Sequence, residues 1–145
     1  VLIPQCFETL VDFCTGPCQE NQALLGKRRI LYRFINFFMD FHYDSKMFFT
    51  SIQLLLALIE NNLHGEVVEL MFEELDFKKL MLKIVEIYKK FIKRFKKEIT
   101  HEKYLTPQQE DMVDAAFSAF VFISNLKMFH PNHPKLAFFD MELTR

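Results

Sequence analysis

The sequence predicts an all-α fold of antiparallel helices in a single domain over residues 1–145. Only 3 residues are glycine and 5 are proline, and so few turn formers cannot easily build the many tight turns of a sandwich or barrel. Apolar residues recur at three- and four-residue spacing, as helices require. Hydrophobic residues make up 50% of the chain, which excludes a disordered segment.

The first expected elements are a short helix and a sharp turn. Pro4 suits a first helical turn, and the helix spans residues 5–14. Gly16-Pro17 ends it, because the residue before a proline is disfavoured in the helical region. Asn21 is expected to cap a second helix, which is interrupted near Gly26 and then resumes. Its continuation carries an apolar row that we expect to be well buried: Ile30, Phe34, Phe37, Phe38 and Phe41.

The middle of the chain predicts three more helices. Asp44 or Ser45 caps the first, which ends at Asn61, Asn62 and Gly65. Its core face is expected to comprise Phe48, Ile52, Leu55, Leu56 and Ile59. A short amphipathic helix follows, with Val67, Leu70, Met71 and Leu75 on its apolar face. Asp76 opens a long helix that runs towards residue 99, with the stripe Leu80, Ile84, Tyr88, Phe91 and Phe95.

The clearest helix start lies at Thr106-Pro107-Gln108-Gln109. Threonine and glutamine three residues apart form a capping box, and proline suits the first helical position. The helix that follows ends before His130, and its expected core face is Met112, Ala116, Phe120 and Ile123. Because no internal repeat is visible, the pattern alone does not separate a degenerate repeat stack from a single helical bundle.

Charge and composition also restrict the partners. The formal net charge is -1, so no overall field steers the chain to nucleic acid. The longest charge-free apolar runs, 47–59 and 115–126, fall short of the ~20 residues of a membrane span. Three cysteines without a signal peptide favour a reducing, cytosolic setting. Because the first residue is Val1, we expect a fragment of a larger chain.

Few residues predict chemistry. Cys14 and Cys18 flank the Gly16-Pro17 turn and would hold zinc only with two further ligands such as His130 and His133; buried structural cysteines are the favoured interpretation. With 3 glycines and no nucleophile elbow or phosphate loop, the chain is not expected to be an enzyme.

A basic run lies between residues 89 and 97. It comprises Lys89, Lys90, Lys93, Arg94, Lys96 and Lys97, interleaved with Phe91, Ile92 and Phe95. Such a helix is able to lie on anionic lipid, contact phosphates or bind a groove in a partner. A solvated face near a helix C-terminus is the favoured alternative, because cations are stabilising there.

The turn region resembles a known family. Residues 10–18, Leu-Val-Asp-Phe-Cys-Thr-Gly-Pro-Cys, followed by Glu20-Asn21-Gln22, are similar to a segment of inositol trisphosphate receptors and, more loosely, ryanodine receptors. The segment belongs to the domain associated with their shared homology region. Residues 54–60 and 75–87 resemble the family's next helices in the same order, and 113–126 do so more weakly. The resemblance covers about residues 7–128.

The resemblance implies an armadillo-like stack within a homotetrameric calcium-release channel, on the cytosolic face of the endoplasmic reticulum membrane. The partners would be other domains of the same polypeptide. Asp12 occupies the position of a family glutamate that helps coordinate the activating calcium ion, and Thr15 replaces a frequent glutamine. Cys14, Gly16, Pro17 and Cys18 form the motif's structural turn.

Calcium is coordinated by six to eight oxygens. Asp12 and nearby helix-end carbonyls would therefore supply only part of a site shared with another domain. We therefore expect the isolated chain to bind no cofactor by itself. The alternative function is a general helical scaffold for protein–protein interaction, with the basic run as its contact surface.

Overall fold

The all-α fold class is confirmed by a computed structural model. It describes residues 2–16, 18–39, 45–61, 65–92 and 106–137, and within these ranges there are helices and turns but no strand. The elements are α1 (Leu2–Cys14), α2 (Gln19–Gly26), α3 (Arg29–Met39), α4 (Ser45–Ile59), α5 (Gly65–Glu74), α6 (Phe77–Ile87), the π-helix η1 (Tyr88–Ile92) and α8 (Pro107–Phe129). The armadillo-like stacking stays a prediction.

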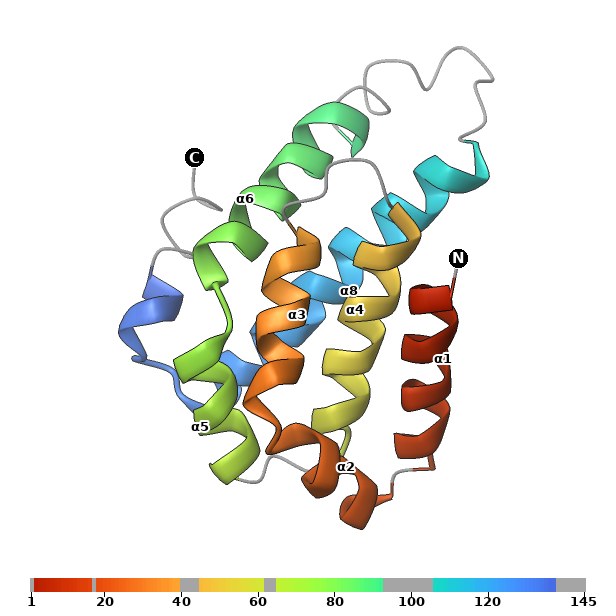
Figure 1. Ribbon diagram of the computed structural model, residues 1–145. Coiled ribbons are helices and arrows are strands. Elements are labelled where there is room, and N and C mark those ends of the chain that lie inside the picture. Colours follow the sequence, from red (N-terminus) through yellow and green to blue (C-terminus); the bar gives the residue numbers. More distant parts are fainter. Residues whose placement is uncertain (1, 17, 40–44, 62–64, 93–105, 138–145) are drawn as a thin grey trace.

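Helix α4 forms the centre of the molecule. Figure 1 shows it between α1 on one side and α3 on the other, with α8 crossing behind and with α5 and α6 beyond α3. Its packing is most extensive against α8 and α1. The expected face is buried at Phe48, Ile52, Leu55 and Ile59, whereas Leu56 is half-buried. Burial extends further round the helix, to Leu54 and Leu58 among others, because neighbouring helices enclose α4 on several sides.

Three predicted helix boundaries are confirmed. Asp76 caps α6, with its side chain accepting a hydrogen bond from the Lys79 amide at 3.0 Å. Thr106 caps α8 in a reciprocal capping box with Gln109. His130 follows the last residue of α8. The first two boundaries depend on short-range side-chain hydrogen bonds, which is why the sequence shows them.

Two predicted boundaries are wrong. Cys18, not Asn21, precedes α2 as its N-cap residue, because the turn returns the chain to helical geometry sooner than the pattern indicates. Gly65 begins α5 instead of ending α4. Asn61 follows α4 in the left-handed region with φ 49°, and asparagine tolerates that region better than most residues. Asp44 and Asn62 lie outside the described residues.

The predicted burial of α3 is also wrong. Ile30, Phe34 and Phe37 are 60%, 49% and 55% exposed. The residues that face the core are Leu31, Tyr32, Ile35 and Met39. Apolar residues cover more than one face of α3, so periodicity alone does not choose the buried one. Phe38 is half-buried and contacts Phe7 of α1 edge-to-face at 6.0 Å, and Phe41 is not among the described residues.

Two further residues expected in the core are exposed. Tyr88 is 46% exposed where α6 continues into the wider η1 turn, which changes the direction of the side chains that follow. Phe120 is 38% exposed, and Phe122 is the fully buried aromatic residue of α8. The side chain of Phe91 and all of Phe95 lie outside the described part.

Candidate interaction site at the α1–α2 turn

The backbone at the end of α1 forms a tight turn at Gly16. Gly16 has φ 113°, a conformation that costs glycine little and most residues much. Around it, the Thr15 amide donates to the Asp12 carbonyl at 3.2 Å, and the Cys18 amide donates to the Cys14 carbonyl at 3.0 Å. The turn is therefore closed by its own backbone. Pro17 itself is outside the described ranges.

Side chains occupy the other carbonyls at the end of α1. The Thr15 hydroxyl donates to the Val11 carbonyl at 2.7 Å, and the Asn21 amide nitrogen donates to the Phe13 carbonyl at 2.7 Å. The helix-end carbonyls expected to help bind calcium thus already accept hydrogen bonds. Asp12 is exposed, and its side chain forms no hydrogen bond or ion pair with any residue that the structure describes. Its carboxylate is therefore open to a ligand from outside the described residues.

Gln22 anchors this turn to the core, a role that the sequence reasoning missed. Its side chain is fully buried, and Nε2 donates to the Ala57 carbonyl at 2.8 Å and the Glu60 carbonyl at 3.0 Å. These carbonyls lie at the end of α4, where intrahelical donors run out. Gln22 therefore ties α2 to the central helix. The sequence feature that could have indicated this role is the four-residue spacing of Gln22 and Gly26, which places both on the buried side of α2.

The two cysteines of the turn are free thiols with different environments. Cys14 is buried and Cys18 is half-buried. Burial, with a smaller effect of Cys18, raises the pKa of the Cys14 thiol. His130 and His133 instead contact Phe72 of α5, with ring centroids 5.5 and 3.9 Å from its ring.

No group of three or more His, Cys, Asp or Glu side chains is placed to hold a metal ion among the residues that the structure describes. The four residues of the zinc alternative are not brought together there.

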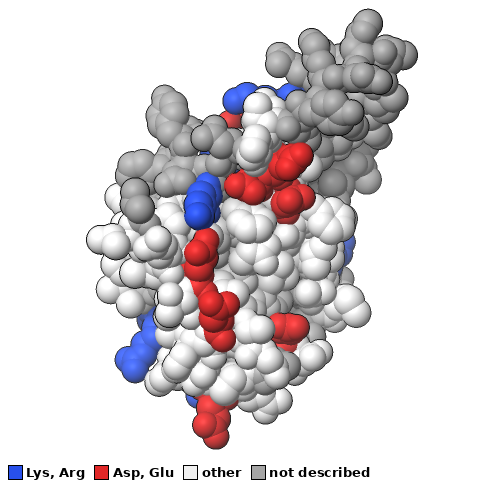
Figure 2. Space-filling model, turned by 90° about the vertical axis from the view of Figure 1, so that its right-hand side faces the viewer, with Lys and Arg blue, Asp and Glu red and all other residues white. Residues whose placement is uncertain are grey.

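The surface around α1 is poor in cations. Glu8 lies one turn before Asp12, and its Oε1 is 3.6 Å from the Lys46 Nζ of α4. Figure 2 shows the side of the molecule on which α1 lies: most of this face is uncharged, and acidic side chains are more prominent on it than basic ones. A cation or a basic partner is therefore favoured at this surface over an anion.

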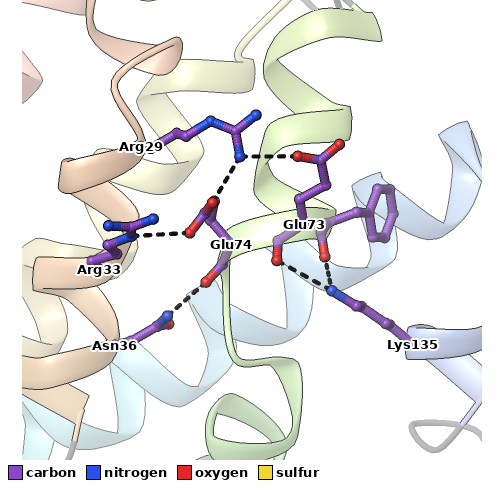
Figure 3. A network of polar contacts seen from close by, with 7 residues as sticks. Arg29, Arg33, Asn36, Glu73, Glu74 and Lys135 are labelled. Atoms are coloured by element: carbon purple, nitrogen blue, oxygen red, sulfur yellow. Dashed lines mark hydrogen bonds and ion pairs between the residues drawn. The ribbon is translucent and has the colours of Figure 1, made fainter.

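A second polar cluster joins α3, α5 and the C-terminal turn (Figure 3). Arg29 Nη1 lies 2.8 Å from Glu74 and 3.1 Å from Glu73, and Arg33 Nε lies 3.3 Å from Glu74. The hydrogen bond from Arg29 is the main cause that lowers the pKa of Glu74. From the other side, Lys135 Nζ donates to the Phe72 carbonyl. The cluster holds the end of α5 in place.

A hollow of about 570 Å³ lies beside this cluster, between α3, the α5–α6 turn and the C-terminal turn. Its polar groups largely satisfy one another: Asn36 donates to the Glu74 carbonyl at 2.7 Å and accepts from the Asp76 amide at 2.8 Å. The hydrogen bonds that these lining residues form with one another explain why polar groups occur there. It indicates no ligand class.

The basic run is described only at its start. Lys89 and Lys90 are exposed in η1, and Lys93, Arg94, Lys96 and Lys97 lie outside the described residues. Gln109–Phe129 is the one described helical segment long and apolar enough to cross a membrane, judged by length and composition. A core helix passes the same test.

Comparison with known proteins adds no assignment. No family model, no curated protein and no solved structure matches this chain.

Proposed function

We propose that this chain is a cytosolic coupling module of a homotetrameric calcium-release channel on the endoplasmic reticulum. It would act by binding other domains of the same polypeptide in an armadillo-like stack, and not by catalysis. The observation that carries the proposal is the motif over residues 10–22, which resembles inositol trisphosphate and ryanodine receptors and includes a hydrogen-bonded turn beside the exposed Asp12.

The proposed role of Asp12 is to supply one side of a calcium site. A carboxylate provides at most two of the six to eight oxygens that calcium takes, and the carbonyls beside it already accept hydrogen bonds. A surface of another domain must complete the coordination. Aspartate is one methylene shorter than the family's glutamate, so that surface must approach α1 more closely or a water must bridge the gap.

The contacts that join the α1–α2 turn to the central helix support a coupling role. Gln22 fixes α2 to α4, and α4 packs against α8. A force applied at the α1–α2 turn would therefore move the central helix with it, because tightly packed interiors transmit displacement. Calcium held between Asp12 and a second domain would change how the two domains sit together.

The test is channel opening against calcium concentration in the full-length protein. Asp12→Asn should shift activation to higher calcium and leave assembly intact, because a charge is lost while shape is nearly kept. Glu20→Gln, at another exposed carboxylate at the start of α2, is the matched control and should leave the curve unchanged. Overlapping wild-type and Asp12→Asn curves would refute the role of Asp12, and a full-length protein without calcium conductance would refute the channel assignment.

A general helical scaffold is the second candidate. The exposed row Ile30, Phe34 and Phe37 on α3 favours it, because contiguous exposed apolar residues mark interaction surfaces. The full-length sequence separates the two functions. A channel requires pore segments after this module and an acidic residue in an earlier helix, whereas a scaffold requires neither.

A further inference from the structure

Helix α8 is apolar on two opposite faces. Its inner face packs against α4 through Ala115, Ala119, Phe122 and Leu126, each no more than 1% exposed. Its length of 23 residues makes it the longest of the described helices. An apolar helix face is normally covered by other parts of a protein, yet the described residues leave Phe117 and Met128 on the outer face largely exposed.

The outer side carries an apolar row that Ser124 interrupts. Val113, Phe117, Val121 and Met128 are spaced by four, four and seven residues, which places them on one face. Phe117 is 69% and Met128 is 79% exposed, while the two valines are half-buried. At 1.5 Å per residue the row is roughly 22 Å long, the length of about four helical turns. We call these four residues the α8 outer row.

Carboxylates without described cation partners border the start of this row. Glu110, Asp111 and Asp114 form no ion pair with any residue that the structure describes. The helix dipole accounts for Glu110, which is in the first turn. It does not account for Asp114, because the dipole effect falls off within that turn and Asp114 lies in the next.

We propose that the α8 outer row docks a cationic amphipathic helix from another polypeptide segment. The apolar side of that helix would cover Phe117 and Met128, and its Lys or Arg side chains would pair with Asp114 and Glu110. An anionic membrane fits less well, because helices that lie on such membranes carry basic residues beside their apolar face and this one carries acidic residues. The inference does not rest on the channel assignment or on Asp12.

The test uses two synthetic 18-residue helical peptides with one leucine face, one with lysines and one with glutamates at the flanking positions. Binding to the 145-residue chain is followed by fluorescence anisotropy. The lysine peptide should bind at least about tenfold more tightly than the glutamate peptide. Phe117→Gln should weaken it about tenfold or more, because the exposed Phe117 ring would lose its apolar contact with the peptide. Asp114→Lys should reduce the preference for lysine.

The matched control is Ile30→Gln on α3, because Ile30 is 60% exposed but lies on a different helix. It should leave binding unchanged, and circular dichroism should show all variants folded. Equal binding of the two peptides, or no effect of Phe117→Gln, would overturn the proposal. The proposal would also be overturned if neither peptide bound but phosphatidylserine vesicles bound the chain and Phe117→Gln abolished that binding. It would likewise be overturned if sedimentation showed that the chain self-associates and that Phe117→Gln dissociates it.

Discussion

Gly26 is the position where local and tertiary reasoning predict opposite results. It is the last residue of α2 and its φ is not positive, so replacement by alanine strains no backbone angle. Helix propensity alone would predict stabilisation by about 1 kcal/mol or less. A Cβ at Gly26, however, would lie 2.7 and 2.9 Å from Cγ1 and Cγ2 of Val67.

Those distances are well inside the ~3.5–4.0 Å of a favourable carbon–carbon contact. Rotating the Val67 side chain does not relieve them, because any staggered rotamer leaves at least one methyl group towards Gly26. Val67 is 1% exposed in α5, so α2 and α5 would have to separate. Overpacking of this kind costs about 1–3 kcal/mol, which leaves a net destabilisation of roughly 1–2 kcal/mol.

Thermal unfolding followed by circular dichroism measures this. Gly26→Ala should lower Tm by roughly 3–8 °C for a chain of this size. Gly65→Ala is the control, since a Cβ there meets nothing within 4 Å, and Tm should stay the same or rise. The double variant Gly26→Ala with Val67→Ala should be less destabilised than the sum of the single variants, by about 1 kcal/mol. An unchanged Tm for Gly26→Ala, or additive effects in the double variant, would refute the predicted clash.

The remaining predictions concern caps and acid sensitivity. Thr106→Ala should cost about 1 kcal/mol in urea unfolding, since it removes one half of the capping box; an unchanged midpoint would argue against that cap. Burial, chiefly, lowers the pKa of His133, so the unfolded chain binds its proton more readily and stability should fall as the pH drops below about 6.5. His133→Asn should flatten that decline, and an unaltered profile would contradict it. Glu74→Gln should lower Tm more than Glu73→Gln, because the side chain of Glu74 is 15% exposed against 60% for Glu73; equal effects would show that the ion pairs contribute little.

The all-α class and the helix ends that depend on neighbouring residues could be predicted from the sequence. Thr106, Asp76 and Gly16 were predictable because a cap or a left-handed turn involves only a few consecutive residues. The motif around Asp12 was readable for the same reason. The turn is a local structure, and the structure adds that its carbonyls are already hydrogen-bonded.

Which apolar faces are buried depends on how the helices pack against one another. Helices α3 and α8 carry apolar residues on more than one side, so spacing did not distinguish Ile35 from Phe34, or Phe122 from Phe120. The position of α4 between them made that choice. Gln22 likewise acquires its role only when residues 35 and 38 positions further along the chain supply the carbonyls that it binds. A residue is buried only when another surface packs against it, and the sequence of one helix describes only its own side of that contact.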